Sequence, residues 1–202
     1  MNLAPRHGSE MQKRLLVLAV LILLAAMAAR TVSAQQSEAR VALLIGNAAY
    51  PQADPPLSEP VSDAKALAEE LHRQGFDVEV GEVLSKEAMQ RALERFYGKI
   101  TPGATALIFF SGYGIQSNRQ NYLIPINAQI WNELDVRRDG IGLDAMIMEQ
   151  LKVRGARVKI VILDASRRNP YERHLRKHSQ GLGPITVPNG TAFICSANQG
   201  TP

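Results

Sequence analysis

The chain has 202 residues, enough for one domain with a sizeable core but too few for two comfortable ones. Its formal net charge is +4, but beyond residue 34 the 19 Lys and Arg residues face 18 Asp and Glu residues, a net charge of +1. This near balance argues against a nucleic-acid partner, and the single cysteine, Cys195, excludes an intramolecular disulfide. Because Cys195 lies in the apolar stretch TAFICSA, we expect it to be a buried core residue.

The first 34 residues have the pattern of an export signal. A basic start precedes the apolar run at 15–28, and Val32-Ser33-Ala34 then forms a small-x-small cleavage site before Gln35. We therefore expect residues 1–34 to be a signal peptide and the protein to be periplasmic or secreted. The alternative is an uncleaved segment that anchors the protein to the inner membrane, and only in that form do we expect contact with a membrane.

Strand-like and helix-like segments alternate after a short linker at 35–39. Apolar or alternating runs predict strands at 40–50 (with a break at Gly46), 76–83, 104–112, 121–126, 157–165 and 190–197. Apolar positions at helical spacing predict helices at 61–74 (closed by Gly75), at 86–97 (capped by Ser85) and at 142–152. The inner strands are apolar on both faces, so this order predicts an α/β fold with a parallel sheet between two layers of helices.

In such a sheet the chemistry gathers where the strands end. SGYG (111–114) and DASRRN (164–169) both follow predicted strands, whereas GNAAY leads into prolines and opens no phosphate-binding loop. The four histidines form no plausible metal triad, so we expect no metal and no cofactor. The basic run at 152–177 is interpreted as a solvated face, with partner binding as the alternative.

Five segments together resemble the caspase-like peptidases, and specifically the bacterial metacaspase or orthocaspase branch. They are VALLIGNAAY, SEPVSDAKALAEELHRQGFDV, ALIFFSGYG, NYLIPI and VILDASRRNP. The resemblance covers roughly residues 40–200 and implies a three-layer caspase-like fold, with a mostly parallel sheet and helices on both faces. Members have a further strand after the fifth, so we expect the domain at 40–202 to be of the large-subunit type and to lack the last strand.

The resemblance places a catalytic histidine at Tyr113 and a catalytic cysteine at Ser166, 53 residues further along. A phenol has an ordinary pKa of about 10 and is a poor base at neutral pH, and serine needs a base to attack a carbonyl. The resemblance therefore implies an inactive pseudopeptidase. One alternative is an active endopeptidase in which His174 or His178 activates Ser166, and another is a purely structural or truncated remnant.

Asp63, Ser111 and Asp164 match the residues that line the pocket for Arg or Lys in metacaspase-like enzymes. The resemblance therefore implies a partner peptide or protein with an exposed Arg or Lys. The alternative is that Asp63 caps its helix and that Asp164 accepts hydrogen bonds from backbone amides. Gly112 and Gly114 keep the backbone tight beside Tyr113. In active relatives the resemblance gives their amides an oxyanion role. Calcium is kept as the alternative to the expected absence of a cofactor, on the resemblance alone.

Overall fold

A computed structural model describes residues 38–51, 57–165, 171 and 182–195. The predicted signal peptide, Ser166, His174 and His178 lie outside these residues, so the expectations about them stay predictions. Within the described residues, no helix has the length and apolar character needed to cross a membrane.

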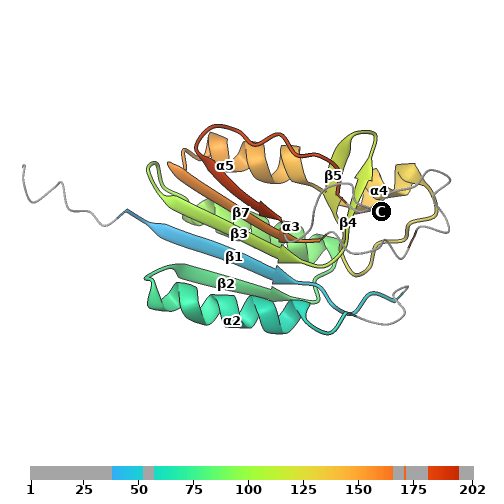
Figure 1. The fold of residues 1–202 in the computed structure, drawn as a ribbon, viewed down its shortest axis with the longest axis horizontal. Coiled ribbons are helices and arrows are strands. Elements are labelled where there is room, and N and C mark those ends of the chain that lie inside the picture. The colour runs from blue at the N-terminus through green and yellow to red at the C-terminus, as the bar shows by residue number, and fades with distance from the viewer. Residues whose placement is uncertain (1–37, 52–56, 166–170, 172–181, 196–202) are drawn as a thin grey trace, which may run out of the picture. The chain divides into compact units, whose positions relative to one another are not determined.

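Helices and strands alternate along most of the described chain (Figure 1). Their order is β1 Arg40–Gly46, α2 Pro60–Arg73, β2 Asp77–Glu82, α3 Lys86–Lys99, β3 Thr105–Ser111, β4 Gly114–Ser117, β5 Gln120–Leu123, α4 Glu133–Asp139, β6 Ile141–Gly142, the π-helix η2 Asp144–Met148, α5 Glu149–Val153, β7 Val158–Asp164 and β8 Thr191–Cys195. The main sheet has the order β2-β1-β3-β7-β8, and each of its neighbouring pairs is parallel. The predicted α/β class with a mostly parallel sheet is confirmed.

Two apolar layers cover the two faces of this sheet, because side chains alternate along each strand. On one face Leu44 and Phe109 pack against Ala64 of α2. On the other face Ile108 packs in a cluster that contains Phe96 of α3 and Leu151 of α5. Figure 1 shows α2 on one side of the strands and α3 and α5 on the other, so the predicted three layers are confirmed.

The ends of the two long helices follow local sequence signals. The Ser85 side chain accepts a hydrogen bond from the Ala88 amide and caps α3, as predicted. Gly75 ends α2 with a φ of +78°, which glycine adopts without strain. The N-cap of α2 is Glu59, and Asp63 lies inside the first turn. The interpretation of Asp63 as a cap is therefore wrong.

Several short elements were not indicated by the sequence patterns. β4, β5 and β6 form a second, antiparallel sheet, and only β5 falls within a predicted strand. α4 is seven residues long, and Asn132 starts it with a capping box. The helix predicted at 142–152 is divided into η2 and α5.

Cys195 is only half-buried, so the prediction of a core residue is wrong. It lies at the end of β8, the outer strand of the sheet that the described residues form. An outer strand has one neighbour and is less covered, and the adjacent Ile194 is 54% exposed.

The turn between β4 and β5 generates the first testable prediction. Asn118 and Arg119 form this two-residue turn and have φ angles of +50° and +62°. Asparagine tolerates this region, but arginine is disfavoured there, and the usual second residue is glycine. We expect Arg119→Gly to raise the free energy of unfolding by about 1 kcal/mol in urea denaturation. Arg119→Ala is the control, because it removes the charge and keeps a Cβ at the same φ. A gain of equal size in both variants would contradict the explanation.

Candidate active site

Three neighbouring strands of the main sheet end at the same level. Gly46, Ser111 and Asp164, the last residues of β1, β3 and β7, are aligned in the parallel register. The chain segments that leave these strands therefore start side by side at one edge of the sheet, which we call the carboxyl edge. The candidate site residues lie at or beside this edge, as expected for a parallel sheet.

Asn47 joins the segments at the carboxyl edge. Asn47 is fully buried, and its backbone N–H donates to Ser111 O at 2.9 Å. The side-chain Oδ1 accepts from the Leu84 amide at 2.8 Å, and Nδ2 donates to Ile124 O at 3.5 Å. One buried side chain thus connects the segments that follow β1, β2 and β5. Its polar atoms are satisfied inside the protein.

The hydroxyl of Tyr50 connects two backbone segments at the carboxyl edge. Its hydroxyl donates to Ile124 O at 2.7 Å and accepts from the Tyr113 amide at 3.2 Å. Burial raises the pKa of the Tyr50 phenol well above its ordinary value. The sequence motif GNAAY indicated a strand end, but neither of these two roles.

Tyr113 is part of a small aromatic core. It is 5% exposed, and its ring lies edge-on to that of Tyr50, with centroids 4.7 Å apart at 66°. The same cluster contains Tyr122 and Tyr171, and burial raises the pKa of Tyr171 to about 12. The phenols of Tyr50 and Tyr171 therefore stay neutral at physiological pH. Tyr113, to which the resemblance gives the place of a catalytic histidine, thus lies among groups that hold their protons.

Ser111 and Asp164 meet across β3 and β7. The Ser111 hydroxyl donates to Asp164 Oδ2 at 3.1 Å; Ser111 is buried, whereas Asp164 is partly exposed. By strand alternation these two side chains lie on the same face as Phe109 and Ile162, the face that α2 covers through Ala64.

Asp63 lies on that face as well. A Cβ on Gly46 would be 2.3 Å from Pro60 O, so α2 begins directly against the carboxyl end of β1. Asp63 follows within the first turn and is exposed. The structure thus joins Ser111 to Asp164 and places Asp63 at the same end of the same face. Their role as a pocket stays a prediction.

The two glycines beside Tyr113 lie where the backbone is closely packed and its amides are paired. A Cβ on Gly112 would lie 2.6 Å from the Tyr50 hydroxyl, and one on Gly114 would lie 2.5 Å from Leu182 Cδ2, so both positions need glycine. However, the Gly112 amide donates to Asp164 O and the Gly114 amide donates to Ala165 O, each at 3.1 Å. In this conformation both amides bond to backbone carbonyls, because the pairing between the two chain segments continues past the end of β3. The oxyanion role that the resemblance gives these amides in active relatives stays a prediction.

The segment that starts at Leu182 is held against this edge. Leu182 is 5% exposed and contacts Gly114. The buried Asn121 accepts from the Gly183 amide at 2.7 Å and donates to Gly183 O at 3.3 Å. The sequence patterns did not indicate this contact.

Among the described residues, no group of three or more His, Cys, Asp or Glu side chains is arranged to hold a metal ion. A calcium site therefore stays an expectation from the resemblance alone. The same applies to a partner carrying an exposed Arg or Lys.

Comparisons with known proteins give one family. The family model described as the caspase domain matches residues 39–200. Among solved structures, the chain is similar to a crystal structure of a protein from Geobacter sulfurreducens, with 16% sequence identity and a TM-score of 0.47. The match covers 63% of this chain and 50% of that chain, so it spans half the length of the other protein. A search of curated proteins gives no match.

The bridging hydroxyl of Tyr50 generates the second prediction. Tyr50→Phe leaves the buried Tyr113 amide and Ile124 carbonyl without this partner, so we expect a loss of about 2 kcal/mol in the free energy of unfolding. The matched control is Tyr122→Phe, which removes a hydroxyl that donates to the Gln120 side chain beside an exposed turn. Thermal and urea unfolding measure both. Equal losses would contradict a special role for the Tyr50 bridge.

Proposed function

The chain belongs to the caspase-domain family, and we propose that it is an exported caspase-domain protein that does not cut peptide bonds and instead binds an exposed Arg or Lys of a peptide or protein. The observation that carries the proposal is the burial of Tyr113 in the aromatic core beside Tyr50. Export is proposed from the signal pattern of residues 1–34.

The loss of catalysis follows from proton chemistry. In the cysteine peptidases that the sequence resembles, a thiolate attacks the carbonyl and an imidazole protonates the leaving amine. A neutral hydroxyl at Ser166 would have to lose its proton across a gap of many pKa units, each worth about 1.4 kcal/mol. The Tyr113 ring is in contact with that of Tyr50, and burial raises the pKa of the Tyr50 phenol above its ordinary value. The oxyanion donors at Gly112 and Gly114 are also engaged by backbone carbonyls.

Binding of a basic side chain is supported by the carboxylate at the end of β7. Ser111 orients Asp164 through one of its oxygens, and Asp164 is partly exposed. Asp63 adds a second negative charge at the same end of the α2-covered face. A guanidinium group matches carboxylate oxygens in a planar fork, whereas a carboxylate ligand would be repelled. This arrangement favours a peptide ending in Arg.

Peptide binding is the third prediction. We expect a short peptide ending in Arg to bind at least about 10-fold more tightly than the same peptide ending in Asp, because the charge contact reverses its sign. Asp164→Asn should remove most of this preference, and Asp144→Asn, at an exposed aspartate of η2, is the matched control. Calorimetry measures all pairs. Equal affinities for the two peptides, or no binding of either, would contradict the proposed pocket and favour a purely structural module.

Absence of turnover is the fourth prediction. We expect no cleavage of Arg-ended fluorogenic peptides by the natural sequence, with calcium present or absent. Tyr113→His and Ser166→Cys together should give more activity than the two single changes combined, because the two groups act as a unit. Turnover by the natural sequence that is lost in Ser166→Ala would overturn the proposal in favour of an active endopeptidase.

A further inference from the structure

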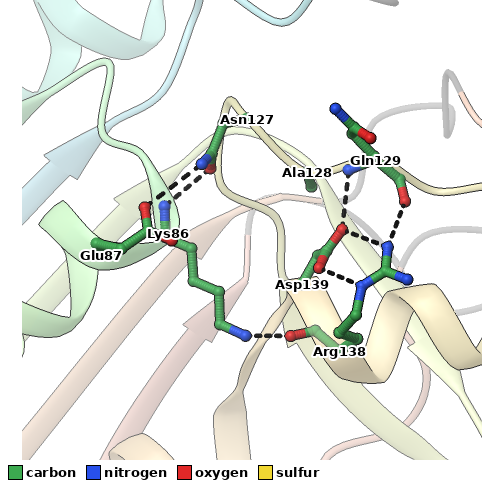
Figure 2. A pocket seen from close by; sticks show the side chains of 7 residues that line it. All are labelled: Lys86, Glu87, Asn127, Ala128, Gln129, Arg138 and Asp139. Carbon is green, nitrogen blue, oxygen red and sulfur yellow. Dashed lines mark hydrogen bonds and ion pairs between the residues drawn. The ribbon is translucent and has the colours of Figure 1, made fainter.

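A hollow lies where the start of α3, the loop after β5 and the end of α4 meet (Figure 2). Its volume is about 360 Å³, which is at the lower end of the range for small-molecule sites. Apart from Ala128, each residue of its lining has a polar or charged side chain. These residues are Lys86, Glu87, Asn127, Gln129, Arg138 and Asp139.

The walls of this hollow are fixed by contacts between the three segments. Asn127 Oδ1 accepts from the Lys86 amide at 2.9 Å, and Lys86 Nζ donates to Arg138 O. Asp139 accepts from the Gln129 amide at 3.0 Å and from Arg138 Nε at 2.8 Å. Figure 2 shows these contacts around the hollow. Side chains held in this way lose little conformational entropy when a ligand binds.

The charges of the lining cancel. Lys86 and Arg138 are cationic, and hydrogen bonds lower the pKa values of the Glu87 and Asp139 carboxyls, so both carboxyls are ionised at neutral pH. An anion or a cation would each be attracted by two groups of the lining and repelled by the other two, so the lining favours neither sign of charge. A neutral ligand that both donates and accepts hydrogen bonds meets no such conflict.

The lining also keeps hydrogen-bonding capacity for a ligand. An ammonium has three N–H donors and a guanidinium has five. Among the residues that the structure describes, the Lys86 ammonium makes one hydrogen bond and the Arg138 guanidinium makes four, so most of the spare donors belong to Lys86. Within the described part of the chain, the exposed Gln129 side-chain amide makes no hydrogen bond, although its backbone contacts Asp139 and Arg138. The hydroxyl groups of a ligand can accept hydrogen bonds from the cationic donors and can donate to the oxygen of the Gln129 side-chain amide.

An exposed aromatic residue that is not part of the lining follows Gln129 closely in the sequence. Trp131 is two residues beyond Gln129 and is 64% exposed. Its amide donates to Asp135 Oδ2 at 3.0 Å, and Asp135 Oδ1 pairs with Arg138 at 2.6 Å, so its backbone is fixed relative to the lining. The indole offers a large apolar surface against which the carbon-bound face of a sugar ring can pack.

We propose that this hollow binds a neutral saccharide, whose hydroxyls bond to Gln129, Lys86 and Arg138 and whose ring packs on Trp131. The proposal does not depend on the peptide pocket or on the absence of catalysis, since it uses none of their residues. It assigns the protein a second site, for a carbohydrate ligand.

The test uses cellobiose and chitobiose as probes of the full chain. We expect saturable binding of at least one of them by calorimetry, together with a change in the emission of Trp131, the single tryptophan of the chain. Gln129→Ala should weaken this binding about 10-fold, the loss expected for one well-placed hydrogen bond. Trp131→Ala should weaken it as well, measured by calorimetry alone.

The matched control is Gln150→Ala, at a partly buried glutamine of α5, which should leave saccharide binding unchanged. Gln129 is exposed, so its variant should unfold at the same temperature as the natural sequence. No saturable binding of either disaccharide would overturn the proposal, and so would equal weakening by the two glutamine variants. Tighter binding of inorganic phosphate or of free arginine than of both disaccharides would show that the site selects charge instead.

Discussion

The common level at which β1, β3 and β7 end is the constraint on which the candidate site depends. Because Gly46, Ser111 and Asp164 are in register, the chain leaves the sheet three times at one place. Asn47 then connects these exits to the segments that follow β2 and β5. A shift of one strand by one residue would turn Ser111 or Asp164 to the opposite face and break their hydrogen bond. The sheet register is thus also the geometry of the site.

Most of the main sheet could be predicted from the sequence, because its strands are apolar runs with no competing interpretation. The runs ending at Gly46, Ser111 and Asp164 have this character, and Ser85 and Gly75 provide local helix signals. The antiparallel sheet could not be predicted, because β4 is short and its turn has arginine where glycine is usual. The burial of Cys195 was predicted wrongly, because an apolar run does not reveal whether its strand has one neighbour in the sheet or two.

The candidate site was predictable only in part. The resemblance located Tyr113, Ser111 and Asp164, and the structure joins the last two directly. The engaged amides of Gly112 and Gly114 depend on strand pairing that extends beyond the strands, which no local pattern indicates. The polar hollow combines residues from three separate segments, of which the start of α3 is distant in the chain from the other two. In sequence they are ordinary surface charges, and they form a lining only when α3 and α4 are brought together.

The burial of Tyr113 also bears on how this position can change over generations. An exposed residue of an active site can be exchanged and restored with little effect on folding, but Tyr113 now fills space beside Tyr50 in the aromatic core. A smaller, more polar imidazole in its place would leave a void and a polar ring among tyrosines. A tyrosine packed in this way therefore ties the identity of residue 113 to the stability of the domain, and its replacement by a smaller polar ring makes demands on the neighbouring tyrosines as well.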